Sequence, residues 1–439
     1  MKERTRQTRG TRQVKKMVII LAFIFTAFPV LSAQQREEND VISVKKDSEV
    51  IQALREMNLD ILFQREGRIF IAAGMDDFIK LDKAGIGYSI ESFAFTQTSE
   101  KDIFSQGGIN GAYHSYLELE KDLYLLESSY PQLAKVKIIG TTHEDRHIYA
   151  VKISDHVHLD ENEASVIFMG GHHAREWISV EIPYLTAKHL LDNYSSDSEI
   201  KNLVDQSEIW IIPLVNPDGL VYSIYFYRYW RKNRRKNEDG SYGVDPNRNY
   251  GYQWGYDNIG SSPNPSSNVY RGPYPFSEPE TQAVRDFMFE KNFKALVSYH
   301  NYSQIIIYPW GYTEEPSPLD DLMHDMSEQM SKKIEQVHGT FYGFGRAGDS
   351  LYLTNGDTTD WGLGVLGIPS FTIELPPADL LSGGFYNSEQ DIMSIFQENL
   401  PAALYLIEWA VQQHRQSLPH PTKEIPEKLK NTKREAEKK

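Results

Sequence analysis

Two histidines and a glutamate lie close together in the segment 171–177, which reads GHHAREW. The segment follows an apolar run at 165–169, so we expect a buried strand to end in a loop of possible metal ligands. If a helical turn starts there, His173 and Glu176 lie on one face and can bind one cation. The alternative is that these charged residues only begin a solvated helix, because HxxE is a common spacing.

A catalytic zinc site usually needs three protein ligands, so a third ligand would come from another part of the chain. The candidate is His300, which follows an apolar strand predicted at 293–299. A single histidine at a strand end is otherwise more often structural than metal-binding. The chain contains no cysteine, which excludes disulfides, thiolate zinc sites and a cysteine nucleophile. Nitrogen and oxygen atoms must therefore hold any metal.

The elements that would position these residues alternate between strand and helix from Tyr113 onward. Apolar runs predict strands at 134–139, 147–153, 165–169, 209–215, 293–299, 305–308 and 370–375, and helical periodicity predicts helices at 116–130, 178–194, 278–289, 319–337 and 389–412. Ser277 is expected to cap the helix at 278–289, and the NPDG segment at 216–219 is expected to form a turn. The pattern predicts an α/β fold with a mixed, largely parallel sheet flanked by helices on both faces. Ligands of such sheets gather at the carboxyl ends of the strands.

The first 33 residues have the pattern of a secretory signal peptide. Residues 1–16 are basic, residues 17–31 are apolar, and small residues precede position 34. An uncleaved membrane anchor is the alternative, but about 15 apolar residues are fewer than the ~20 needed to span a bilayer. We therefore expect a secreted or periplasmic protein without a stable membrane anchor. The net charge is −15, and a more acidic chain remains once residues 1–33 are removed, which argues against a nucleic-acid partner.

Residues 34–105 read as a small α+β unit followed by a connector. Strands are expected at 41–44 and 68–72 and helices at 48–57 and 75–84, and residues 85–90 are expected to form a turn and a last strand before the polar stretch 96–111. This organisation is typical of an N-terminal prodomain with an exposed connector, and the alternative is a permanently attached accessory domain. The main domain is then 106–414. Residues 415–439 are rich in Lys, Glu and Pro and are predicted to form a charged, flexible tail.

Five separated motifs between 113 and 409 resemble those of the zinc carboxypeptidase family, typified by pancreatic carboxypeptidase A and secreted bacterial relatives. They are HAREW at 173–177, RYWRK at 228–232, GVDPNRN at 243–249, His300 with Tyr302, and YLTNGDTTDW at 352–361 combined with SFTIEL at 370–375. The resemblance implies a monomeric hydrolase with one Zn²⁺ that releases single amino acids from peptide or protein C-termini. It also implies synthesis as an inactive precursor, in which the N-terminal unit caps the cleft.

The resemblance assigns the zinc ligands to His173, Glu176 and His300. It makes Glu374 the group that activates the zinc-bound water and Arg231 the cation that stabilises the oxyanion. A glutamate at a strand end is otherwise usually solvated or ion-paired, and the basic residues at 228–236 could also form a generic charged face. We expect Arg231 alone to point inward and the rest of that run to lie mostly at the surface.

The resemblance also implies the residues that bind the substrate. Asn247 and Arg248 would hold its terminal carboxylate, because a guanidinium can form two parallel hydrogen bonds to a carboxylate. Tyr352 would close over the same end, on a loop that contains Gly348 and Gly356. Arg175 would contact the substrate one residue upstream. In addition, Tyr302 belongs to the substrate site, and Asp245 is expected to orient His173.

Two positions depart from the family pattern or leave it open. Asn301 follows the third ligand where the family usually has a small residue such as serine. Thr359 occupies the position that tunes the pocket for the terminal side chain, where an acid would favour Lys or Arg and a large aliphatic would favour aromatics. We predict neutral to hydrophobic terminal residues with broad tolerance, although Asp357 nearby could attract a base.

Two other functions remain open from the sequence. One is a catalytically silent homologue that binds peptide ends, although all three ligand candidates and Glu374 are present. The other is a peptidase acting on murein stem peptides, which uses a similar metal core. The pair Asn247 and Arg248 favours ordinary peptide C-termini.

Overall fold

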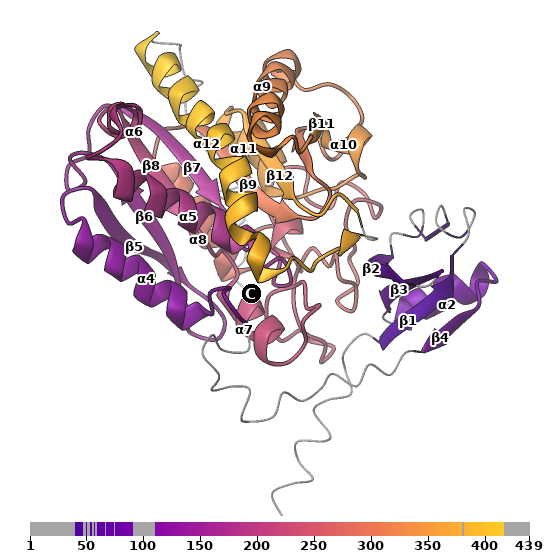
Figure 1. The fold of residues 1–439 in the computed structure, drawn as a ribbon. Coiled ribbons are helices and arrows are strands. Elements are labelled where there is room, and N and C mark those ends of the chain that lie inside the picture. Colours follow the sequence, from indigo (N-terminus) through magenta and orange to yellow (C-terminus); the bar gives the residue numbers. More distant parts are fainter. Residues whose placement is uncertain are drawn as a thin grey trace, which may run out of the picture.

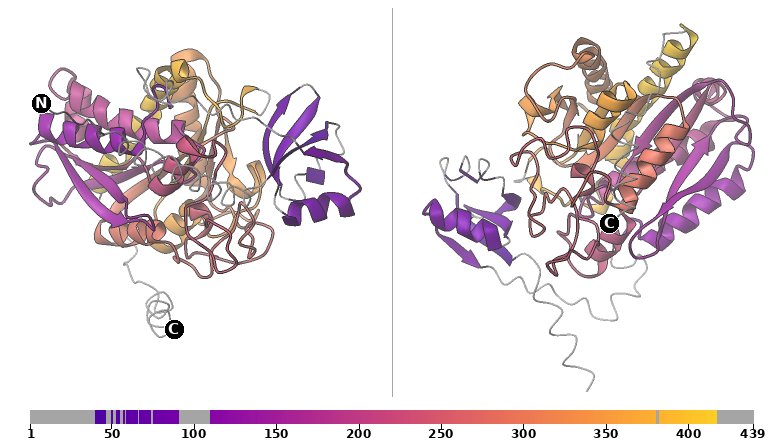
Figure 2. Two further views of the ribbon diagram at one scale, coloured as in Figure 1. Left: turned by 90° about the horizontal axis from the view of Figure 1, so that it is seen from below. Right: turned by 180° about the vertical axis from the view of Figure 1, so that it is seen from behind.

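The structure is a computed structural model that describes residues 40–90, with short gaps, and 110–416 apart from 380 and 381. The predicted signal peptide, most of the connector and the charged tail from 417 onward lie outside the described residues. Figures 1 and 2 show a large α/β domain with a small sheet set to one side of it. Among the described residues, no helix combines the length and the apolar character needed to cross a membrane.

The large domain contains a sheet whose described strands run in the order β11-β10-β12-β9-β7-β8-β6-β5. Their bounds are β5 Ala134–Thr141, β6 His147–Ile153, β7 Ala164–Met169, β8 Ser207–Ile212, β9 Phe293–Asn301, β10 Ile305–Tyr308, β11 Gly343–Arg346 and β12 Ser370–Leu375. The pairs β7 with β8, β7 with β9, β9 with β12 and β10 with β11 are parallel, and β5 with β6, β6 with β8 and β10 with β12 are antiparallel. The predicted mixed sheet is confirmed.

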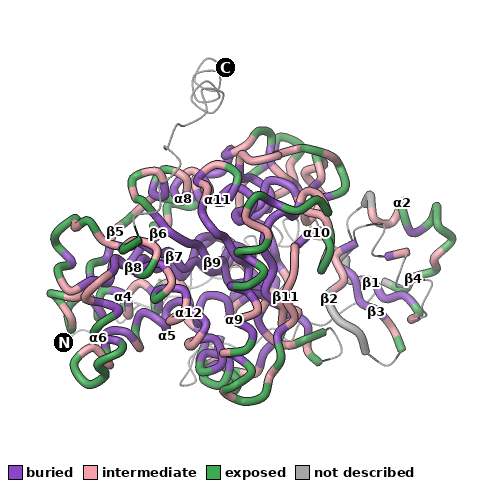
Figure 3. The backbone as a smooth tube through the Cα atoms, turned by 90° about the horizontal axis from the view of Figure 1, so that it is seen from above, coloured by how far each residue is buried: buried purple, intermediate pink, exposed green. Residues whose placement is uncertain are grey.

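Helices cover both faces of this sheet. They are α4 Tyr116–Ser129, α5 Ile178–Asn193, α6 Ser198–Val204, α7 Pro217–Tyr225, α8 Pro279–Glu290, α9 Asp320–His338, α10 Ala347–Ser350, α11 Thr358–Leu366 and α12 Ile392–Arg415, with 3₁₀ turns η1 Pro246–Arg248 and η3 Glu389–Asp391. Successive side chains of β7 enter different cores: Val166 and Phe168 pack with residues of α4, α5, α9 and α12, whereas Ile167 and Met169 pack with residues of α8 and α11. Figure 3 shows β7, β8 and β9 buried inside the molecule. Because both faces are covered, most residues of these three strands are apolar.

The small N-terminal unit is a sheet of order β2-β3-β1-β4 with one described helix, α2. The bounds are β1 Asp40–Lys45, β2 Asp60–Arg65, β3 Arg68–Ala73, α2 Met75–Lys83 and β4 Tyr88–Ile90. Its own core includes Ile42, Leu54 and Ile71. The predicted helix at 48–57 lies mostly outside the described residues, and β2 was not predicted from the sequence.

Three local predictions were wrong. The segment at 216–219 does not form a free turn, because the Asn216 side chain accepts a hydrogen bond from the Gly219 amide and caps α7. The strand predicted to reach 215 ends at Ile212. Helix α8 begins one residue later than expected: Glu278 is the N-cap, and the Ser277 hydroxyl donates to its carboxylate at 2.6 Å.

Candidate metal centre

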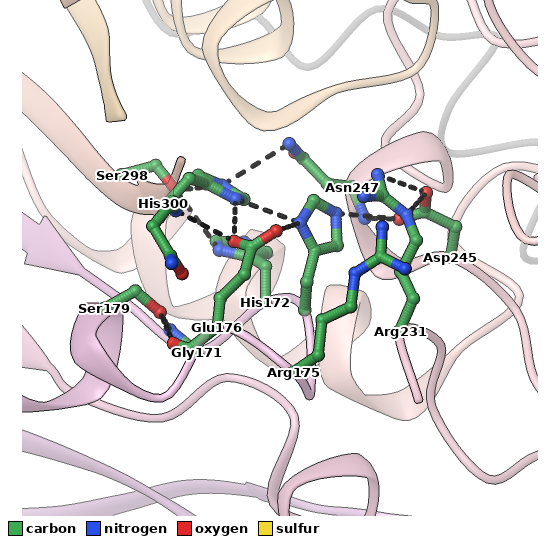
Figure 4. Close-up of polar contacts among 12 residues, drawn as sticks. Gly171, His172, Arg175, Glu176, Ser179, Arg231, Asp245, Asn247, Ser298 and His300 are labelled. Atoms are coloured by element: carbon green, nitrogen blue, oxygen red, sulfur yellow. Dashed lines mark hydrogen bonds and ion pairs between the residues drawn. The ribbon is translucent and has the colours of Figure 1, made fainter. Parts of the chain in front are cut away.

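The three predicted metal ligands meet at the carboxyl ends of two neighbouring strands. His173 and Glu176 follow β7, and His300 lies near the end of β9, which pairs with β7 in parallel. The tight loop after β7 needs glycine, since Gly171 has a φ of +62° and a Cβ on Gly170 would lie 1.9 Å from the Ser179 carbonyl oxygen. Figure 4 shows the Glu176 carboxylate directed toward His300.

The ligand atoms lie slightly closer together than they would around a tetrahedral zinc ion. His173 Nδ1 lies 2.8 Å from Glu176 Oε1, and His300 Nδ1 lies 2.9 Å from Glu176 Oε2 and 3.1 Å from His173 Nδ1. Ligands bound to zinc at about 2.0–2.1 Å and a tetrahedral angle lie about 3.3 Å apart, so a small expansion would accommodate the ion. All three residues are buried. Two imidazole nitrogens and a carboxylate suit zinc.

Asp245 links this centre to Arg231. Its Oδ1 lies 3.2 Å from His173 Nε2, and its Oδ2 accepts from Arg231 Nε at 2.9 Å. When His173 donates the hydrogen on Nε2 to Asp245, the lone pair on its Nδ1 faces the other two ligands. Burial opposes ionisation of Asp245, but Arg231 and His173 together hold its pKa well below the usual value. The carboxylate therefore fixes both the imidazole and the guanidinium.

His172 takes no part in the ligand set. It is fully buried and lies 2.9 Å from the Tyr250 hydroxyl and 3.2 Å from the Ser298 hydroxyl. Burial and the neighbouring imidazoles hold its pKa well below the ordinary value. The Thr358 hydroxyl lies 3.2 Å from its Nε2, so this neutral imidazole has three hydroxyl neighbours behind the ligand set.

Glu374 stands beside His300, because the two residues are register partners on the adjacent parallel strands β12 and β9. Side chains that are register partners on neighbouring strands point to the same face of a sheet. Burial raises the pKa of Glu374 well above its usual range, and the charge of Glu176 raises it further. A bound cation would oppose this shift, because positive charge favours the carboxylate.

Asn247 and Arg248 lie on the 3₁₀ turn η1, which Asp245 caps by accepting from the Asn247 amide. The Asn247 side-chain oxygen accepts from the Thr358 amide at 3.0 Å and the Thr358 hydroxyl at 2.8 Å. Arg248 donates from Nε to the Gly260 carbonyl oxygen at 2.8 Å and from Nη1 to its neighbour's carbonyl oxygen at 2.7 Å. Among the described residues, no carboxylate forms an ion pair with this buried guanidinium, so Arg248 can accept an anion from outside.

Comparison with known proteins assigns this chain to a family. The model of the family described as zinc carboxypeptidase matches residues 119–402, more than half of the chain. The chain belongs to the zinc carboxypeptidase family. It is similar to carboxypeptidase B of Astacus astacus, 34% identical over 65% of this chain and 93% of the relative. It is also similar to a zinc carboxypeptidase of Saccharothrix mutabilis subsp. capreolus, 35% identical over 65% of this chain and 67% of the relative.

The crystal structure of thrombin activatable fibrinolysis inhibitor is similar in fold, with 28% identity and a TM-score of 0.70. The likeness covers 85% of this chain and 99% of the other, a larger share of this chain than the main domain makes up. The protein is thus a zinc-dependent metallocarboxypeptidase, a family whose members use one Zn²⁺ and act on peptide C-termini.

Further residues of this carboxypeptidase line the same region. Tyr302 packs edge to face on Phe385, with ring centroids 4.9 Å apart. Tyr352 is 50% exposed, in the segment between α10 and α11. Thr359 is buried, and its hydroxyl donates to Asp357 Oδ1 at 2.9 Å. These positions are compatible with the roles expected from the sequence.

The basic run at 228–236 is less exposed than predicted. Lys232 is buried and donates to the Pro265 carbonyl oxygen at 2.8 Å. Arg228 stacks on Trp177 at 3.8 Å from the ring centroid and donates to the Arg175 carbonyl oxygen at 2.6 Å. Lys236 is the one cation of this run that is exposed. The prediction that Arg231 alone points inward was therefore wrong, because aromatic faces and main-chain carbonyls near the carboxypeptidase site accept the other cations.

Sequence reasoning missed the partners of Arg175. Its Nη1 and Nη2 donate to the two carboxylate oxygens of Asp60 at 2.5 and 2.6 Å. Its guanidinium carbon lies 3.8 Å from the centroid of the Phe385 ring. Asn268 also donates to Asp60, at 2.8 Å. Asp60 belongs to β2 of the N-terminal unit, so no local pattern in the sequence could have connected it to a site more than 100 residues away.

Proposed function

We propose that this carboxypeptidase hydrolyses the last peptide bond of its substrates with Glu374 as general base and His173, Glu176 and His300 as zinc ligands. The observation that carries the proposal is the placement of Glu374 next to His300 by strand register, beside a buried Arg231 and a buried Arg248. When bound, zinc supplies Lewis acidity and lowers the pKa of water toward about 7.

The protein groups then have separate tasks. Arg248 and Asn247 hold the terminal carboxylate of the substrate, which sets the scissile bond beside the ligand set. Glu374 takes a proton from the attacking water and gives it to the leaving nitrogen as the carbon–nitrogen bond breaks. Arg231, held by Asp245, donates to the oxygen that becomes negative in the transition state. The products are a free amino acid and a peptide shortened by one residue.

Mass spectrometry of a peptide that ends in Leu tests this assignment. We expect loss of one residue at a time from the C-terminus, loss of activity with a chelator, and recovery with Zn²⁺. The variant Glu374→Gln should bind zinc and fail to cleave. Internal cleavage, or cleavage that survives complete removal of metal, would contradict the proposal. Binding of the peptide without cleavage by the zinc-loaded protein would favour the catalytically silent alternative.

We further propose that the N-terminal unit keeps the enzyme inactive until the connector at 96–111 is cut. The support is the ion pair between Asp60 of β2 and Arg175, a residue that we propose contacts the substrate. The similar protein thrombin activatable fibrinolysis inhibitor is, by its name, one that can be activated. We expect the intact chain to be at least tenfold less active than the same chain after cleavage in the connector. Equal activity before and after cleavage would refute this regulation.

We propose a preference for neutral to hydrophobic terminal residues with broad tolerance. Asp357 caps α11: Oδ1 accepts from the Thr359 hydroxyl at 2.9 Å and the Asp360 amide at 2.8 Å, and Oδ2 accepts from the Thr354 hydroxyl at 2.7 Å. Because three donors already occupy this carboxylate, it is a weak partner for a substrate Lys or Arg. Peptides that differ only in the last residue test this: Leu and Phe should be released faster than Lys and Arg.

We also propose export of the precursor by residues 1–33 and a monomeric secreted or periplasmic product. The support is the basic, apolar and small-residue order of that segment. N-terminal sequencing of protein recovered outside the cytoplasm should begin near residue 34. A product that retains Met1 would contradict the export proposal.

A further inference from the structure

The ion pair of Arg175 joins two parts of the chain that are proposed to separate. Asp60 holds the guanidinium through both carboxylate oxygens, at 2.5 and 2.6 Å, and the Arg175 side chain is 2% exposed. A bidentate pair of this kind combines charge with a fixed orientation of the carboxylate. In the precursor, Arg175 is therefore a buried cation with a matched anion.

Within the large domain, Arg175 has no such partner. Among the described residues, Asp60 is the one carboxylate that forms an ion pair with it. Its other neighbours are the Phe385 ring and Arg228, a second cation that donates to the Arg175 carbonyl oxygen. When the N-terminal unit leaves, the guanidinium loses its counter-charge, and the place that Asp60 held opens to substrate. An anion from the substrate would restore the counter-charge.

Asn268 completes the arrangement around the carboxylate. Its Nδ2 donates to Asp60 Oδ2 at 2.8 Å, the oxygen that also accepts from Arg175 Nη1. Three donors from two residues thus converge on one carboxylate group. Asn268 is neutral, so it attracts a carboxylate through the amide hydrogen without repelling a cation elsewhere.

We propose that Arg175 and Asn268 form a subsite for a side-chain carboxylate of the substrate, an Asp or Glu in one of the two residues before the scissile bond, and that Asp60 occupies this subsite in the precursor. This inference rests on the proposed function, because Arg248 is taken to hold the terminal carboxylate. A second carboxylate at Arg175 must then come from a side chain further up the peptide. Asn268 would be a specificity-determining residue of the carboxypeptidase.

The test uses the full chain cut by a protease within 96–111 and loaded with zinc. Four groups of peptides end in the same Leu and carry Asp, Asn, Ala or Lys at one of the two preceding positions, with Ala elsewhere. We expect kcat/KM for Asp to exceed that for Asn by about tenfold at one of these positions, and Lys to be the poorest substrate. The comparison of Asp with Asn isolates charge, since the two side chains have nearly the same shape.

The variant Asn268→Asp provides the decisive second measurement. The new carboxylate would pair with Arg175 and repel an acidic substrate. The kcat/KM for the Asp peptide divided by that for the Asn peptide should therefore fall from about 10 to about 1 or less. The matched control is Asn258→Asp, the same change at an exposed residue whose side-chain oxygen accepts from Arg271 at 2.9 Å. The control should keep the ratio of the unchanged protein. A general loss of folding would lower kcat/KM for all peptides by the same factor and leave the ratio unchanged.

The outcomes separate this inference from the proposed function. Cleavage of the Ala peptides with no preference for Asp would overturn the acidic subsite and leave the carboxypeptidase activity standing, with Arg175 bound to main-chain carbonyls of the substrate. An Asp preference that persists in Asn268→Asp would remove Asn268 from the subsite. No cleavage of any peptide would overturn both proposals.

Discussion

Replacing Asp245 with Asn should weaken zinc binding and catalysis together. The carboxylate is fully buried and accepts from Arg231 Nε at 2.9 Å and from the Asn247 amide at 2.9 Å, and it lies 3.2 Å from His173 Nε2. The amide of Asn keeps the shape and removes the charge. The change therefore leaves the Arg231 guanidinium buried without its counter-ion. Since an amide has one oxygen where the carboxylate has two, either Arg231 or His173 also loses its hydrogen-bond acceptor.

The magnitude follows from those contacts. Removing one partner of a buried ion pair costs about 3–5 kcal/mol of folding stability. Loss of the group that orients a metal-binding histidine typically weakens metal binding about 10- to 100-fold. Displacement of an oxyanion donor lowers kcat by about 10²–10³. We expect kcat/KM at saturating zinc to fall by at least about 10² and the zinc Kd to rise about 10- to 100-fold.

The matched control is Asp218→Asn. Asp218 is also fully buried, accepts from Arg146 at 2.7 Å and from the Thr142 hydroxyl at 2.7 Å, and forms no contact with the ligand set. It should lose comparable stability in a thermal unfolding experiment and keep zinc affinity, measured by competition with a chelator. If Asp245→Asn loses stability to the same extent as the control while zinc affinity and kcat/KM stay within about threefold of the unchanged protein, the coupling through Asp245 is wrong.

Three further changes have defined outcomes. Glu374→Gln should lower kcat/KM by about 10²–10⁴ with zinc content unchanged, and substantial residual activity would point to another base. Thr359→Asp should raise release of Lys relative to Leu by about tenfold or more, because it adds a negative charge to the position expected to contact the terminal side chain; an unchanged ratio of kcat/KM values would place the pocket elsewhere. Burial lowers the pKa of His114, but hydrogen bonding to Glu181 and Asp122 outweighs this and raises it from 6.5 to about 9. The stabilisation is therefore complete below about pH 6.5 and lost as pH rises through about 9, with at most about 3 kcal/mol involved. His114→Gln should lack this pH dependence when unfolding is followed between pH 6 and 10.

The strands and long helices of the main domain were predictable, because burial on both faces leaves continuous apolar runs and amphipathic helices leave a 3.6-residue period. The elements that were missed are short or depend on distant contacts. Helix α7 begins at Pro217, directly after its N-cap Asn216, in a segment whose sequence is typical of a turn. Asn216 can be recognised as a cap only if the residues after it are known to be helical. Helix α11 contains two glycines and follows Asp357, whose side chain caps it. Neither has a strong local signal.

The residues of the candidate site also fall into those that the sequence could predict and those that it could not. The metal ligands and Glu374 could be found because each stands at the end of an apolar strand in a family motif. Burial of Lys232 could not be predicted, since a charge run looks the same whether carbonyls or water surround it. The contact of Asp60 with Arg175 and Asn268 joins two regions by tertiary structure alone. Propensity and spacing carry no information about such a pair.

The pairing of His300 with Glu374 across β9 and β12 has a consequence for how this chain can vary. The distance between the two side chains is set by where two strands line up, and the number of residues that connect them has no influence on it. Insertions or deletions in the loops of the intervening segment therefore leave this pair of side chains in place, provided that they fall outside β9 and β12. A single residue added inside β12 upstream of Glu374 would turn that carboxylate to the opposite face of the sheet. Length variation in those loops thus says nothing about the spacing of His300 and Glu374, whereas a shift of one residue within β12 separates them.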